Sequence, residues 1–296
     1  MIVGTTPRFR QIVIEVWKPI SILFIWDVAV TVFHFYTPIK EPPLPTALFG
    51  TALALFLGFR TNAAYARWWE ARTLWGALIN ASRSLARVTL SFSRSGDAHD
   101  LALRDRVIRL QMAFAHTMRC QLRGQSPRDD IARLAGGEMA DRAWTRRNPA
   151  NVLLEDISGL YADAYAAGRL DSIQQSTVER ILIDIANAQG GMERIKNTPL
   201  PNGFQFFPNL FSRLFCILLP IALVEALGIA TPVGSTLISL VFLAILRIGD
   251  DLTDPFANSV HDIPLTAMST TIEIDLSQSL GLTAPEPLKP DHGVLW

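Results

Sequence analysis

Four long apolar segments, one pair near each end of the chain, constrain its fold more than any other feature of the sequence. A helix needs ~20 consecutive apolar residues to cross the hydrocarbon core of a bilayer, and in lipid a helix satisfies its own backbone hydrogen bonds. The first pair predicts helices at about 14–36 and 44–66, and the second pair lies within 205–249. The fourth segment, 236–248, is barely long enough to span. The chain is therefore expected to be a multi-pass integral membrane protein.

Charged residues are concentrated between the two pairs, where apolar side chains recur with the period of amphipathic helices. No alternating strand pattern of any length appears there, so an all-α fold is expected. After Arg60 the second apolar segment continues without Gly or Pro until Gly76, which predicts one long helix that leaves the membrane near Arg60. The expected domains are an N-terminal transmembrane pair (1–66), a cytoplasmic helical domain (67–204), a C-terminal transmembrane pair (205–249), and a cytoplasmic segment ending in a loose Pro-rich tail (250–296).

Positive charges set the expected orientation of these helices. The short connections at 37–45 and 228–235 hold one lysine between them. Arginines lie beyond the opposite ends of the first two segments, at Arg8, Arg10, Arg60, Arg67 and Arg72. Because cytoplasmic loops carry the excess of Lys and Arg, we expect both termini and the middle domain of this plasma-membrane protein in the cytoplasm.

The composition excludes several function classes. The chain has 27 Lys and Arg and 27 Asp and Glu, so no net positive field favours binding of nucleic acid. No Gly-rich phosphate loop, GxSxG turn or zinc-ligand spacing is present. The sequence therefore predicts no enzyme activity and no required cofactor.

The second apolar segment carries the most specific pattern. Thr51, Leu55 and Phe59 recur every four residues, so they share one helix face at intervals of ~6 Å along the axis. A parallel stripe of small residues runs beside them, at Gly50, Ala54 and Gly58. Small residues let helices approach closely in lipid, and large apolar ones facing a pore can gate ions by dewetting. Ordinary packing within a helical bundle accounts for the same stripes.

An ionisable residue, Asp27, lies within the first apolar segment. A carboxylate at this depth marks a functional site by default. The alternative is a structural hydrogen bond to a neighbouring helix, for which Arg213 and Arg247 are candidates.

Two longer motifs resemble signatures of the bestrophin family and its bacterial homologues. The first is LGFRTNAAYARWWEARTLWG (57–76), and the second is DDLTDPFANSVHDIPLTAM (250–268). One follows the second apolar segment and the other follows the fourth, as in the family. The resemblance covers nearly the whole chain.

This resemblance implies a homopentameric ion channel with four transmembrane helices and a cytoplasmic helical bundle around a central pore. It assigns the apolar pore neck to Thr51, Leu55 and Phe59, although the family usually has a bulky aliphatic residue where Thr51 stands. A hydroxyl-bearing ring at this position is expected to be more wettable. The resemblance places a cytosolic aperture at Ile173.

The same resemblance implies a candidate calcium site, because eukaryotic members bind calcium after the fourth helix. The acidic residues available there are Asp250, Asp251, Asp254 and Asp262. Calcium takes six to eight oxygen ligands, and the family's uninterrupted run of carboxylates is missing here.

The resulting hypothesis is a channel that passes small monovalent ions passively, with cations favoured because bacterial homologues resemble cation channels. Its expected partners are the lipid bilayer, four further copies of the chain and the permeant ions. The competing hypotheses are a secondary transporter, which would favour inverted repeats and broken helices, and a membrane-anchored scaffold protein. A scaffold would not need the paired stripes of the second helix.

Overall fold

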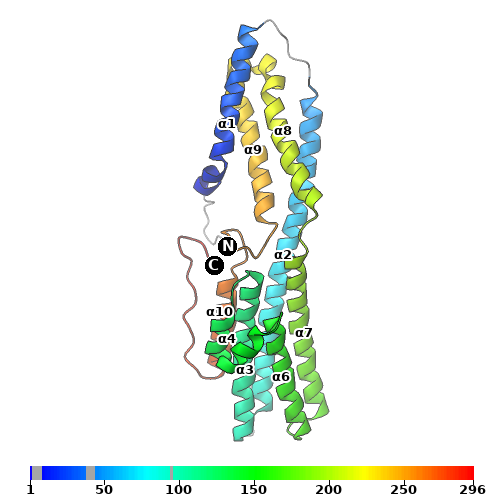
Figure 1. Ribbon diagram of the computed structural model, residues 1–296, viewed down its shortest axis with the longest axis vertical. Coiled ribbons are helices and arrows are strands. Elements are labelled where there is room, and N and C mark those ends of the chain that lie inside the picture. The colour runs from blue at the N-terminus through cyan, green and yellow to red at the C-terminus, as the bar shows by residue number, and fades with distance from the viewer. Residues whose placement is uncertain (2–8, 38–43, 94–95) are drawn as a thin grey trace. The chain divides into compact units, whose positions relative to one another are not determined.

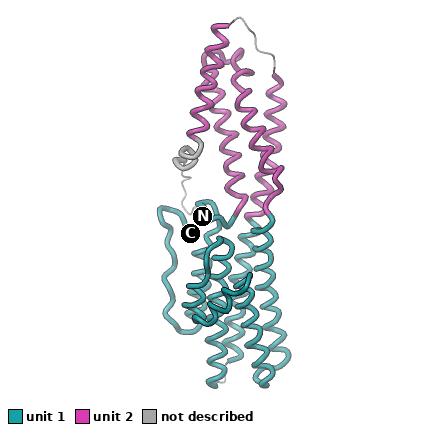
Figure 2. The backbone as a smooth tube through the Cα atoms, viewed as in Figure 1, with its two compact units in different colours: residues 1–3, 69–198, 255–296 teal, residues 4–68, 199–254 magenta. Residues whose placement is uncertain are grey.

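The chain folds into two units, each with its own set of helices (Figure 2). The computed structural model describes residues 1, 9–37, 44–93 and 96–296, with side chains in the first helix described from Trp17 onward. Unit 2 comprises Gly4–Trp68 and Pro199–Asp254, and unit 1 comprises Trp69–Thr198 and Pro255–Trp296 with the N-terminal residue. No β-strand occurs among the described residues, which confirms the all-α expectation.

Unit 2 holds the apolar helices (Figure 1). They are α1 (Phe9–Tyr36), the first part of α2 (Thr46–Phe92), α8 (Asn202–Leu227) and α9 (Thr231–Asp251). Among the described residues, three stretches are long and apolar enough to cross a membrane, and the third contains both α8 and α9. Four separate membrane crossings stay a prediction.

Helix α9 is longer than the sequence analysis predicts. The expected break at 228–235 is reduced to one 3-10 turn, Gly228–Ala230, and α9 begins directly after it. Pro232 occupies the first turn of α9, where its missing N–H costs nothing. The Thr231 hydroxyl donates to the Gly228 carbonyl at 2.6 Å. The resulting helix of 21 residues reaches the length that a bilayer requires.

Helix α2 runs without a break over 47 residues, as predicted. It contains no proline, and its only glycines are Gly50, Gly58 and Gly76. At about 1.5 Å per residue it is ~70 Å long.

The core of unit 2 forms between α2, α8 and α9. Buried apolar side chains from the three helices make one cluster: Leu53, Leu57, Phe215, Cys216, Leu219, Leu243 and Leu246. The Phe215 ring also contacts Phe49 and Phe242, with ring centroids 5.7 and 4.9 Å apart. One side of α2 is therefore committed to packing within its own chain.

Unit 1 is a helical bundle. Its helices besides the rest of α2 are α3 (Ala98–Leu122), α4 (Arg128–Ala135), α5 (Gly137–Trp144), α6 (Pro149–Ala166), α7 (Ser172–Asn197) and α10 (Leu265–Ser279). Pro149 fills the first turn of α6, and the Asn148 side chain accepts from the Asn151 N–H at 3.2 Å. The Thr89 and Tyr161 hydroxyls, 2.6 Å apart, hydrogen-bond α2 to α6 in the core.

Helix α10 was not predicted, because 250–296 read only as a cytoplasmic segment with a loose tail. It packs against α3 (Figure 1). The expectation of a loose arm is wrong for the end of the tail. The Leu295 N–H donates to the Met1 carbonyl at 2.9 Å, and the Ala267 N–H donates to the Trp296 carbonyl at 2.7 Å.

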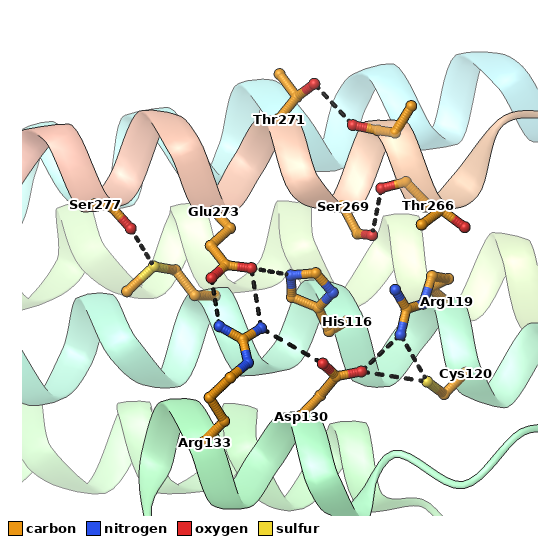
Figure 3. Close-up of polar contacts among 12 residues, drawn as sticks. His116, Arg119, Cys120, Asp130, Arg133, Thr266, Ser269, Thr271, Glu273 and Ser277 are labelled. Atoms are coloured by element: carbon orange, nitrogen blue, oxygen red, sulfur yellow. Dashed lines mark hydrogen bonds and ion pairs between the residues drawn. The ribbon is translucent and has the colours of Figure 1, made fainter. Parts of the chain in front are cut away.

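A buried polar network joins α10 to α3 and α4 (Figure 3). Glu273 of α10 lies 2.7 Å from His116 Nε2 and accepts from Arg133 at 2.5 and 3.1 Å. Asp130 extends the network by bonding Arg119 at 2.6 Å. Burial opposes the charge of Glu273, but the hydrogen bonds from His116 and Arg133 outweigh it and lower its pKa from 4.5 to about 2. The charged carboxylate therefore stabilises unit 1.

Unit 1 is expected to lose stability in acid through Glu273. Because the folded pKa lies below the unfolded value, this stabilisation is complete above about pH 4.5 and is lost as the pH falls towards 2. Glu273→Gln should remove roughly 2–3 kcal/mol at neutral pH and weaken the acid dependence. Thermal unfolding of the full chain in detergent, followed by circular dichroism across this pH range, measures both effects. Glu138→Gln, on an exposed residue, serves as the control, and equal behaviour of the two variants would contradict the assignment.

Candidate functional site

Helix α2 has one side facing its own chain and one side exposed. Leu53 and Leu57 are 3% and 1% exposed, whereas Leu55 and Phe59 are 60% and 63% exposed. Thr51 is also exposed and shares the face of Leu55 and Phe59. The structure thus places the three predicted neck residues together, outside the core of their own chain. Their role as a pore neck stays a prediction.

The exposed face of α2 extends beyond these three residues. With the same helical period, this face begins at Leu48. Beyond Phe59 it continues through residues that are mostly smaller or more polar than the neck residues. Exposed positions on it are Asn62, Ala66, Trp69, Thr73, Ala77, Asn80 and Arg87. The sequence analysis recognised only the apolar part. The rest could have been found by continuing the four-residue and three-residue steps along the helix.

The hydroxyl of Thr51 is already used within α2. It donates to the Ala47 carbonyl at 2.8 Å, a common bond for threonine in a helix. Only the acceptor capacity of this oxygen then remains for water. A ring of Thr51 side chains would therefore be less wettable than the sequence alone suggests.

A buried arginine, Arg60, holds α2 against α9. Its side chain is 1% exposed, one Nη forms an ion pair with Asp250, and the other donates to the Leu246 carbonyl at 3.2 Å. Gly249 makes room for it, because a Cβ there would lie 3.0 Å from the Arg60 guanidinium. Arg67 donates through Nε to the Thr253 carbonyl at 3.0 Å.

The sequence analysis missed the Arg60 pair, although its signal was present. Arg60 is the first charge after a long apolar run, and Asp250 is the first acidic residue after the fourth apolar segment. Charges at such depths normally pair with one another. At 100° per residue, Arg60 points about 180° away from Thr51. The pair therefore fixes the rotation of α2 so that the neck face turns outward from its own chain.

One part of the stripe of small residues on α2 packs within its own chain, and the other part is exposed. A Cβ on Gly50 would lie 3.1 Å from the Phe215 ring, so Gly50 packs against α8 of the same chain. Ala54 and Gly58 are exposed, and apart from its own stretch of α2 no described atom lies within 4 Å of a Cβ placed on Gly58. The stripe expected to pack on neighbouring subunits is thus partly used within the chain.

Ile173 lies in the first turn of α7 and is 76% exposed. A capping box fixes this turn, because the Asp171 carboxylate accepts from the Gln174 N–H at 2.7 Å and the Gln174 side chain accepts from the Asp171 N–H at 2.9 Å. Ile173 is not a core residue of its own chain. Its assignment to a cytosolic aperture stays a prediction.

The acidic residues considered for calcium have other partners. Asp250 pairs with Arg60, Asp251 lies 3.3 Å from Arg247, and Asp262 accepts from the Ser259 N–H at 2.6 Å. In the part of the chain that the structure describes, no three His, Cys, Asp or Glu side chains are grouped so that they could hold a metal ion. A calcium site at these four aspartates stays a prediction.

Asp27 is buried, and its carboxylate accepts from the Thr236 hydroxyl of α9 at 2.9 Å. This partner is a hydroxyl on a neighbouring helix rather than Arg213 or Arg247. The contact fits the structural alternative for Asp27 and joins α1 to α9.

The chain is similar to bestrophin proteins both in sequence and in structure. Residues 8–278 match the family model described as Bacterial/Fungal Bestrophin protein. The chain is 39% identical over 259 residues to the voltage-dependent anion channel-forming protein YneE of Escherichia coli K12, covering 86% of this chain and 83% of that one. It is 36% identical to the protein of the same name from Salmonella typhi, over 89% and 86% of the two chains. A crystal structure of a bacterial bestrophin homolog from Klebsiella pneumoniae superposes with a TM-score of 0.85 at 31% identity, covering 90% of this chain and 99% of that one.

The ion pair of the buried Arg60 should matter more to stability than the neighbouring ion pair of the half-exposed Arg247. Asp250→Asn leaves the Arg60 guanidinium without its counter-charge, and breaking a buried pair typically costs about 3–5 kcal/mol. Because Asp250 is itself partly exposed, we expect a loss of about 3 kcal/mol in thermal unfolding of detergent-solubilised protein. Asp251→Asn is the matched control, since its pair with the half-exposed Arg247 is worth ~1 kcal/mol or less. Equal losses in the two variants would show that Arg60 does not depend on Asp250.

Proposed function

Because the chain belongs to the bacterial and fungal bestrophin family, we propose that it is a passive ion channel whose pore is lined by the exposed face of α2. The family comprises ion channels rather than enzymes. The curated relatives carry the name of channel-forming proteins, which favours this function over the transporter and scaffold hypotheses.

The observation that carries the proposal is the exposure of Leu55 and Phe59. Each is more than half exposed on a helix whose opposite side forms the core. The polar side chain of Asn62 follows them on the same face, whereas polar groups are costly on a face turned only to lipid. Around a central axis, copies of Leu55 and Phe59 would form stacked apolar rings one turn apart. Such rings exclude water from a narrow neck and so gate ion passage.

One copy of α2 cannot enclose a pore, so the proposal requires several copies of the chain. The family resemblance implies five. Ala54 and Gly58 flank the neck face and are exposed, and small residues at this place allow close approach of a neighbouring helix. Their exposure supports a homopentamer packed through this side of α2.

The proposal includes a second constriction at Ile173, whose exposed side chain is held in place by the capping box of α7. It also includes a bacterial inner membrane location with both termini cytoplasmic. The arginines beyond the neck, including Arg60 and Arg67, support this orientation.

The permeant ion is the point on which the sequence expectation and the relatives' names differ. The resemblance to bacterial homologues implies cations, whereas the curated relatives are named anion channel-forming proteins. The neck residues are neutral, so they select by hydration and width rather than by sign. We retain small monovalent ions as the substrate class, with cations as the proposal to be tested.

Truncation of the neck should increase ion flow. Leu55→Ala and Phe59→Ala each widen the dewetted gap and should raise unitary conductance or open probability in planar bilayers. Leu57→Ala is the matched control, because Leu57 is buried on the opposite side of α2. It should cost about 2–5 kcal/mol of stability and leave the unitary current unchanged. The neck assignment fails if both neck variants conduct like the wild type.

The sign of the permeant ion follows from the reversal potential in asymmetric NaCl. A cation channel shifts it towards the equilibrium potential of sodium, by up to about 59 mV for a tenfold gradient. A shift of the opposite sign would show anion selectivity and would correct the cation proposal while leaving the channel proposal intact. Saturable flux without unitary steps would instead support a transporter.

A further inference from the structure

Unit 2 contains a pocket that the channel function does not use. It has a volume of about 810 Å³ and lies between α1, α8 and α9. Trp26 of α1 borders it and donates through its indole N–H to the Ile217 carbonyl of α8 at 2.9 Å, which ties two of its walls together. The volume falls within the roughly 300–1,000 Å³ of typical small-molecule sites.

The walls of this pocket are apolar and open outward. Ile22 is 68% exposed and Ile217 is 43% exposed. Both belong to stretches that are long and apolar enough to cross a membrane. Exposed isoleucines on a membrane-spanning stretch meet hydrocarbon rather than water. An occupant of the pocket must therefore offer an apolar surface.

Three cationic side chains line the same pocket: Lys18 of α1, Arg213 of α8 and Arg247 of α9. Asp250 also lines the pocket but pairs with Arg60, and Asp251 lies 3.3 Å from Arg247 and offsets the charge of that one cation. No ion pair of Lys18 or Arg213 is found among the described residues. The pocket therefore presents two positive charges without a counter-charge from the described side chains.

The three cations lie at a similar depth. At about 1.5 Å per residue, Lys18 is ~27 Å from the Tyr36 end of α1. Arg213 is ~21 Å from the Leu227 end of α8, and Arg247 is ~24 Å from the Thr231 end of α9. Because the hydrocarbon core is ~30 Å thick, all three lie within ~9 Å of the boundary opposite those ends. Long Lys and Arg side chains at this depth extend to the level of the lipid headgroups.

We propose that this pocket binds an anionic phospholipid, with its phosphate between Lys18 and Arg213 and an acyl chain along Ile22, Trp26 and Ile217. The cations supply the charge that a phosphate requires, and the walls supply the apolar surface that a soluble phosphate could not use. Basic pockets between transmembrane helices bind acidic lipid headgroups in this way. The inference is independent of which ion the channel passes.

Quenching of Trp26 fluorescence by brominated lipids tests the proposal at the pocket itself. The full-length protein is reconstituted into phosphatidylcholine vesicles that contain either brominated phosphatidylglycerol or brominated phosphatidylcholine at a matched mole fraction. The signal of Trp26 is the difference between the wild type and Trp26→Phe. We expect phosphatidylglycerol to quench this signal preferentially, with an apparent affinity at least about tenfold higher than phosphatidylcholine. Equal quenching by the two lipids would overturn the proposal. A neighbouring copy of the chain that covers the pocket would also give equal quenching.

Charge variants separate the site from general effects. Lys18→Gln with Arg213→Gln should abolish the preference for phosphatidylglycerol, whereas Lys18→Arg with Arg213→Lys should keep it and show that the helices still pack. Arg146→Gln with Arg147→Gln removes two exposed cations of unit 1 and should leave the preference unchanged. Inorganic phosphate added to the vesicles should not compete, and full competition by it would show a phosphate site rather than a lipid site. An unchanged preference in the first double variant would overturn the proposal.

Discussion

The ion pair between Arg60 and Asp250 is the interaction on which the arrangement of α2 depends. A buried guanidinium loses its hydration, and only a close counter-charge and hydrogen bonds offset that cost. Asp250 and the Leu246 carbonyl of α9 supply both, and Gly249 leaves the space that the guanidinium needs. These partners lie on one helix, so the pair holds α2 in one rotation about its axis. Arg60 then points inward, and the face that carries Thr51, Leu55 and Phe59 points outward.

This division of α2 explains how one helix can serve both packing and conduction. Leu53 and Leu57 supply the packing, through a core shared with α8 and α9. Leu55 and Phe59 remain exposed and are available to face a pore axis when copies of the chain assemble. Further along the helix the exposed face carries polar residues, Asn62, Thr73 and Asn80, between Ala66, Trp69 and Ala77. That change fits a passage that is dry over a short distance and hydrated elsewhere.

Much of this arrangement could be predicted from the sequence, because lipid imposes strict demands on helix length and polarity. The unbroken helix α2 followed from the absence of proline, and the shared face of Thr51, Leu55 and Phe59 followed from their four-residue spacing. The start of α9 was misplaced, because Gly228, Pro232 and Gly234 suggest a longer break than the single 3-10 turn that forms. Helix α10 was missed because its stability comes from tertiary contacts, above all those of Glu273 with His116 and Arg133. The partner of Arg60 could not be chosen by periodicity, since pairing across 190 residues of sequence depends on how the helices pack.

The central claim is that the face opposite Arg60 lines a pore. The most direct measurement is a cysteine scan of α2 from Leu48 to Asn62 in a background without Cys120 and Cys216, in which a charged thiol reagent is applied during current recording. The account predicts block at Thr51, Leu55, Phe59 and Asn62, with Leu53 and Leu57 unreactive, because reagent in the pore reaches only the exposed face. Block centred on Leu53 and Leu57, or block without helical periodicity, would contradict it.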